Sequence, residues 1–238
     1  QALNAAQLQS LGAAQLNSIL QGPGITLTQL PWLTSAQVSW ITPSLFGGSA
    51  AVFIQAFTTS QVPAFTAAQL QSFSTVNLQA FTAAQIGVMT AVQLTALTDA
   101  QVPTLTTAQV AALLPAQIAM LQPREITDFT AAQIGALTTA QMGALTGSEV
   151  AALTSAQMNV LTSSQFQAIS ATGISGLTGA QIAGLSTAQI GLLTSTEMSG
   201  FTAAQLPSFS TAQLNALTPT QVAGLSSSAI SGFSTAQI

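Results

Sequence analysis

One octapeptide, repeated along almost the whole chain, constrains the fold more than any other feature. A clear copy is residues 129–136, Phe-Thr-Ala-Ala-Gln-Ile-Gly-Ala. We number its positions one to eight: an apolar residue, Thr or Ser, two small residues, Gln, an aliphatic residue and two further small residues. From Ile25 to Phe233 this pattern recurs every eight residues, with an irregular stretch at residues 45–56. We therefore treat the chain as one array of repeats rather than count domains by its length.

Positions two and five together form a capping box. Counted from Ile25, position two is Thr or Ser in 24 of 27 octads, and position five is Gln or Glu in 22 of 27. In a capping box, the hydroxyl accepts a bond from the N–H of the third helical residue, whose side chain accepts one from the N-cap N–H. Apolar residues at positions one and six fit the hydrophobic staple that accompanies such a start. Each octad therefore predicts the beginning of a helix.

The helices must be short. Eight residues at about 100° each displace the pattern by roughly 80° per copy, so one long helix would have no apolar face. Proline agrees with this in two ways. At position three it would be the first helical residue, where a missing N–H is harmless, and at position seven it would end the helix. The position-three prolines are Pro43, Pro115, Pro123 and Pro219, and the position-seven prolines are Pro31, Pro63, Pro103 and Pro207.

These patterns predict an all-α solenoid of octapeptide repeats, in which each octad is a one-turn capped helix followed by a corner. An isolated turn is unstable, so stability must come from stacking the copies. Positions one and six would form the core, lined by small residues at positions four and eight. Thr, Ser, Gln and Asn would form the surface. The alternative is a β-solenoid, which Thr, Val and Phe favour but frequent Ala, Gln, Leu and Met oppose.

The imperfect copies suggest a division of this continuous array. Residues 1–18 are octad repeats, residues 19–56 are an irregular segment with modified octads, and residues 57–238 are the regular solenoid. Residues 19–24 are two residues short of an octad, and Trp32 and Trp40 occupy the normally small position eight. The irregular segment is interpreted as a cap or a bend, with neutral drift as the other reading.

The composition leaves little chemistry to assign. Charged residues are 3% of the chain, and it contains no His, Lys or Cys. Without these groups, or a cluster of acids, acid–base catalysis and metal ligation have no basis. We predict no enzyme and no catalytic, cofactor-binding or metal-binding residues. Nucleic-acid binding and a membrane span are not expected, and folding should depend little on pH. The charged side chains are Asp99, Arg124, Glu125, Asp128, Glu149 and Glu197.

In its repetition, its Thr, Ser, Gln and Ala usage and its lack of charge, the chain resembles the long, low-complexity repetitive proteins that bacteria export to their surfaces. Such proteins act as adhesins or extracellular fibres. The resemblance covers the whole chain and implies a structural or adhesive role, at the cell surface or outside the cell. It supplies no functional residues.

Two functional hypotheses follow. The first is a structural protein that forms a rod or filament by end-to-end or lateral association with copies of itself. Its motivation is that the chain begins and stops within an octad, so that uncovered end coils would expose positions one and six. The second is an ice-binding or carbohydrate-binding adhesin module, with surface glycans as partners, that uses a repeated Thr, Ser and Gln surface. Position three would be its exposed array, but the residues there vary.

Overall fold

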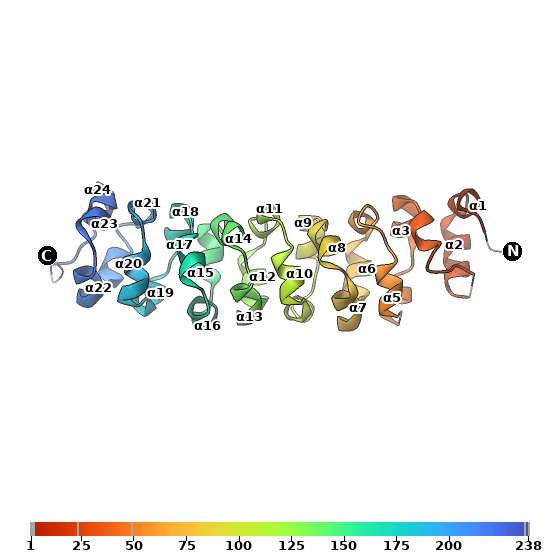
Figure 1. Ribbon diagram of the computed structural model, residues 1–238, viewed down its shortest axis with the longest axis horizontal. Helices are drawn as coiled ribbons and strands as arrows, with labels where there is room; N and C mark the ends of the chain where they lie inside the picture. The colour runs from red at the N-terminus through yellow and green to blue at the C-terminus, as the bar shows by residue number, and fades with distance from the viewer. Residues whose placement is uncertain (1–2, 23, 49, 236, 238) are drawn as a thin grey trace. The chain divides into compact units, whose positions relative to one another are not determined.

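The computed structural model describes residues 3–22, 24–48, 50–235 and 237, and every regular element in this part of the chain is helical. The all-α prediction is confirmed, and the β-solenoid alternative is wrong. The chain divides into two compact units, Gln1–Leu113 and Leu114–Ile238. Figure 1 labels most of the α-helices of both units.

In its described part, the first unit contains α1 (Ala5–Gln9), α2 (Ala13–Leu20), the 3-10 helix η1 (Leu30–Trp32), α3 (Ser35–Trp40), α4 (Ser44–Gly47), α5 (Ala51–Gln55), η2 (Val62–Ala64), α6 (Ala67–Ser72), α7 (Thr75–Ala80), α8 (Ala83–Gly87), α9 (Ala91–Thr95), η3 (Val102–Thr104) and α10 (Thr107–Ala111). The second unit contains α11 (Pro115–Ile118), α12 (Pro123–Asp128), α13 (Ala131–Gly135), α14 (Thr139–Ala144), α15 (Gly147–Ala152), α16 (Ser155–Asn159), α17 (Ser163–Gln167), α18 (Ala171–Ile174), α19 (Gly179–Gly184), α20 (Thr187–Leu192), α21 (Ser195–Met198), η4 (Leu206–Ser208), α22 (Thr211–Asn215), α23 (Pro219–Gly224) and α24 (Ser227–Ile230).

Most of the α-helices begin with the predicted capping box. At the start of α16, the Gln157 N–H donates to Thr154 Oγ1 at 3.2 Å, and the Thr154 N–H donates to Gln157 Oε1 at 2.8 Å. The same reciprocal pair opens α13, where Thr130 and Gln133 are the partners. The backbone N–H groups at these helix starts are therefore paired within a single octad.

Proline sets the form of the helix as well as its length. The four octads with proline at position seven form the 3-10 helices, and in each of them the proline is the middle residue. A proline there has no N–H to donate to the carbonyl four residues earlier, so the α-helical bond is lost. Pro115, Pro123 and Pro219 are the first residues of their helices, as predicted. Pro43 differs, because it lies one residue before α4.

Within each unit, helices stack on helices three octads away. In the second unit α12 packs on α15, α15 on α18 and α18 on α21, and in the first unit α5 packs on α7 and α8 on α10. The starts of α12 and α15, at Pro123 and Gly147, are 24 residues apart, which is three octads. One coil of the solenoid therefore contains three octads, and the short helices form three stacked columns.

The core differs from the predicted core at two positions of the octad. Positions one and six are buried, as with Leu137 and Met142, but position five is buried too. Position four faces solvent instead of lining the core, since Val76 is 63% exposed and Val92 is 74% exposed. The expectation that Gln belongs to the surface is thus wrong for position five. Its buried amides in the regular repeats include Gln61, Gln69, Gln85, Gln93, Gln101, Gln109, Gln117, Gln133, Gln141, Gln157, Gln165, Gln205, Gln213 and Gln221.

The irregular segment of the first unit combines a short copy with a phenylalanine cluster. Coil-to-coil bonds continue past the short copy, since Gln37 Nε2 donates to the carbonyl oxygens of Leu8 and Leu11. In the octads at residues 41–48 and 49–56, Leu45 and Phe53 replace the position-five amide. There the buried Phe46 ring lies 6.1 Å from the Phe53 ring and 4.8 Å from the Phe73 ring, between centroids. Aromatic packing takes the place of amide bonding at this point, and the proposed boundaries at residues 18 and 56 stay a prediction.

Glycine at position eight allows backbones of adjacent coils to touch in the second unit. A Cβ atom on Gly224, the last residue of α23, would lie 2.6 Å from the carbonyl oxygen of Ser195. Gly184 is the last residue of α19, yet a Cβ atom there would meet nothing within 4 Å. The two positions are equivalent in the octad and differ only in the closeness of the coil beneath.

This difference predicts opposite effects of the same substitution. Gly224→Ala should destabilise the second unit by about 1–3 kcal/mol, because a backbone contact must open to admit the methyl group. Gly184→Ala should be neutral or stabilising by up to about 1 kcal/mol, because alanine favours the helix and has room. Thermal and urea unfolding of both variants would measure the effects. Equal destabilisation by both substitutions would contradict this account of the coil contact.

Candidate functional site: the glutamine ladder between coils

The most regular polar feature of the structure is a ladder of position-five glutamines that joins adjacent coils. Gln157 Nε2 donates to the carbonyl oxygens of Ile126 at 2.8 Å and Phe129 at 2.7 Å, which lie 31 and 28 residues earlier. Gln221 repeats both bonds with Ile190 at 2.7 Å and Leu193 at 2.8 Å. We call each such glutamine a rung. The same two-bond rung is formed by Gln61, Gln69, Gln85, Gln93, Gln101, Gln109, Gln181, Gln205 and Gln213.

Each rung uses the whole amide. Its oxygen accepts the N-cap N–H of its own octad, and its two N–H groups reach the coil beneath. The acceptors are position-six and position-one carbonyls at the end of a short helix, where helices have carbonyl groups without an intrahelical partner. A buried amide of this kind has no unmet hydrogen bond. One side chain therefore caps its own helix and bonds the adjacent coil.

The bonding partners follow octad register rather than residue count. Gln37 Nε2 donates to the carbonyls of Leu8 and Leu11, which are 29 and 26 residues earlier. Both separations are two residues shorter than in the regular rungs, and the intervening residues 19–24 are the copy that lacks two residues. The short copy is therefore absorbed without loss of the ladder.

Three of the charged residues singled out from the sequence lie together on α12. Glu125 occupies a rung position, and its Oε1 accepts a bond from Arg124 Nη2 at 2.7 Å. Arg124 Nη1 lies 3.6 Å from Asp128 Oδ2. The guanidinium thus compensates both carboxylates. This arrangement lowers the cost of burying Glu125, because a paired charge is far less costly to bury than an isolated one.

Glu149 and Glu197 occupy two other rung positions of the second unit. The Thr146 N–H donates to Glu149 Oε2 at 2.6 Å, and the Thr194 N–H donates to Glu197 Oε2 at 2.6 Å. Glu149 is buried and its Oε1 has no hydrogen-bond partner, whereas Glu197 is half-buried. Burial raises the pKa of Glu149 above its ordinary value, and the bonds from Thr146 oppose that rise. At both sites the carboxylate still accepts the N-cap N–H, but an ionised carboxylate has no donor for the coil beneath.

The described residues include no group of three His, Cys, Asp or Glu side chains that could hold a metal ion. In the same part of the chain, the helices are all too short to cross a bilayer. The absence of enzymatic activity and of cofactors remains a prediction from composition.

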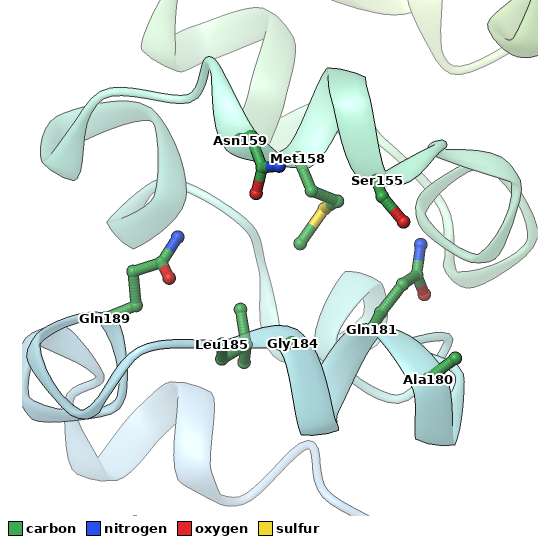
Figure 2. Close-up of a pocket in the computed structure, with 8 residues that line it drawn as sticks. All are labelled: Ser155, Met158, Asn159, Ala180, Gln181, Gly184, Leu185 and Gln189. Carbon is green, nitrogen blue, oxygen red and sulfur yellow. The ribbon is translucent and has the colours of Figure 1, made fainter.

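One small hollow marks a rung that is not made. Ser155, Met158 and Asn159 of α16 face Gln181 and Gly184 of α19 across it, with Leu185 and Gln189 at one side (Figure 2). Gln189 Oε1 accepts the Ser186 N–H at 2.9 Å, but among the described residues its Nε2 makes no bond to the coil beneath. The volume of about 40 Å³ admits a few water molecules and is far below the 300 Å³ or so of a small-molecule site.

A larger hollow of about 340 Å³ lies in the irregular segment of the first unit. It coincides with the two octads in which Leu45 and Phe53 replace the rung glutamine. Its lining has no polar side chain that could orient a ligand, and binding sites normally include a few. The lining residues are Leu20, Leu27, Leu45, Gly48, Ala50, Val52 and Phe53.

Comparison with known proteins finds no matching family model and no matching curated protein. The ladder itself was missed in reading the sequence, although the sequence contains a signal for it. Either Glu or Gln completes a capping box, yet position five is Gln in 19 octads and Glu in only three. The strong preference for the amide indicates a need for donor groups as well as an acceptor.

The contribution of a rung can be isolated by comparing two glutamines with equivalent caps. Gln213→Leu and Gln189→Leu both remove the bond to a Ser N–H, but only Gln213 also bonds the carbonyls of Ile182 and Leu185. Gln213→Leu should therefore cost about 1–3 kcal/mol more in the free energy of unfolding, since it leaves a buried acceptor unpaired. Urea unfolding of the second unit would measure both. Equal losses would show that the ladder bonds contribute no net stability.

Proposed function

We propose that this protein is a structural element that forms a rod or filament by association with copies of itself. The observation that carries the proposal is the repeated coil interface, in which every regular coil offers amide donors on one side and carbonyl acceptors on the other. Because these two sides are complementary, a coil can be covered by the next coil of its own chain or by a coil of another copy. Association of this head-to-tail kind extends into a filament wherever the rotation between copies does not close a ring.

The apolar core supports the same proposal. Positions one and six are buried by neighbouring coils within each unit, so a coil without a neighbour would expose them to water. Covering that surface would favour association through the hydrophobic effect, and the rungs would fix the register of the two copies. A place at the cell surface or in an extracellular matrix fits the composition and its resemblance to exported repetitive proteins.

The ice-binding or glycan-binding alternative receives less support from the geometry. It requires a repeated Thr, Ser and Gln surface, but the position-five amides are buried in the ladder and the position-two oxygens accept capping bonds. Position three remains exposed, and its residues vary from octad to octad. The structural role is therefore the one we propose.

The test is the state of association of the 238-residue chain as its concentration rises. We expect sedimentation velocity to show linear growth and negative-stain microscopy to show extended particles. A matched pair of variants locates the contact. Gln7 and Gln15 are the position-five amides of the first two octads, where each accepts the N-cap N–H of its own octad. Gln7→Glu with Gln15→Glu replaces these amides by carboxylates that repel carbonyl oxygens, and should weaken association by about tenfold or more, equivalent to about 1.4 kcal/mol.

The control variant is Ala83→Glu, which adds a charge at an exposed position three in the middle of the first unit and should leave end-to-end association unchanged. A chain that stays monomeric over the whole concentration range would contradict the proposal. Association weakened equally by the control would indicate lateral rather than end-to-end contacts. Dose-dependent binding to a glycan array, without self-association, would favour the adhesin alternative.

A further inference from the structure

Glu149 stands at an interior rung position of the second unit, between the octads of Gln141 and Gln157 along the chain. In the coils on either side, the equivalent positions hold Glu125 and Gly173. Glu149 belongs to α15, which packs against α12 on one side and α18 on the other. Its side chain is nearly inaccessible, at 1% exposure, so water does not solvate it. It therefore has to find its hydrogen bonds within the coil interface.

The carboxylate leaves one half of the rung unmade. Oε2 accepts the Thr146 N–H, as the amide oxygen does in a regular rung, but the buried Oε1 has no partner. Regular rungs bond the carbonyls that lie 31 and 28 residues earlier in the chain. At position 149, these would be the carbonyls of Ile118 and Leu121. A carboxylate cannot donate to a carbonyl, whereas a carboxylic acid has one O–H that can.

We infer that Glu149 is a protonation-controlled rung, which bonds the adjacent coil as a neutral carboxylic acid and releases it as a carboxylate. In the neutral form, one oxygen still accepts the Thr146 N–H while the O–H donates to a corner carbonyl. On ionisation the proton leaves to solvent, and a buried negative charge faces acceptor oxygens without a counter-charge.

The charged groups around Glu149 do not offset this effect. On α12 they are Arg124, Glu125 and Asp128, and the guanidinium already compensates the two acids beside it. On α18 there is no charged side chain. Desolvation is accordingly the largest influence on Glu149 and raises its pKa, while the hydrogen bonds from Thr146 lower it.

The sign of the pH dependence follows from that direction. The folded state holds the Glu149 proton more tightly than the unfolded state, in which the pKa is about 4.5. The stabilisation is therefore fully present below this pH and is lost as pH rises through the higher pKa of the folded state. The second unit should therefore be more stable toward unfolding in acid than at neutral pH. This differs from the expectation that folding depends little on pH.

Two variants of the full chain separate this role from a general effect of charge. Glu149→Gln restores the donor, so its thermal transition should lie a few degrees above that of the parent protein at pH 7, with the gap closing toward pH 4. Glu197→Gln removes an equal charge at a half-buried rung position and should keep the pH dependence of the parent. Thermal unfolding from pH 4 to pH 8 would measure all three proteins.

Carbon-13 NMR of the glutamate carboxyl groups gives a readout independent of stability. The signal that disappears in Glu149→Gln should titrate above pH 4.5 in the parent, and amide hydrogen exchange in α15 should be slower at pH 5 than at pH 7 after correction for the intrinsic rate. The inference is overturned if that carboxyl titrates at or below 4.5. It is equally overturned if Glu149→Gln and the parent unfold together at pH 7.

Discussion

The buried amide at position five is the interaction on which the rest of the structure depends. A helix of one turn is unstable by itself, since few hydrogen bonds follow its costly nucleation. The amide addresses this twice, because it pairs the N-cap N–H of its own octad and the carbonyls of the coil beneath. Each short helix is consequently held at both a local and a tertiary level by one side chain.

The apolar core and the ladder have different roles. Burial of positions one and six supplies a driving force that is large but has no direction, so it does not by itself select a register between coils. The rung selects the register, because both N–H groups of its amide must reach carbonyls at one corner of the adjacent coil. Gln37 shows the strength of this selection, since it keeps its two bonds across a copy that is two residues short.

Departures from the ladder show what the array tolerates. Phe53 replaces a rung and packs on Phe46 and Phe57, with ring centroids 6.1 Å and 5.5 Å away, so apolar packing substitutes for hydrogen bonds. Gln189 keeps its cap beside a small hollow, and Glu149 keeps its cap with one oxygen unpaired. Because each coil contacts only its neighbours, such defects remain local and the stack continues on either side.

The sequence by itself determined what is decided within eight residues. The capping box, the staple and the position of proline fixed where each helix begins and ends, and hence the all-α solenoid, because these contacts join residues only a few positions apart. Tertiary structure alone decided that a coil contains three octads, that position five is inside and position four outside, and that Gln157 bonds Ile126 and Phe129. The number of octads per coil depends on the angle between successive helices, which packing sets. A capping box is equally complete whether its amide faces water or another coil, so the ladder, and the unpaired oxygen of Glu149 within it, became visible only when the coils were stacked.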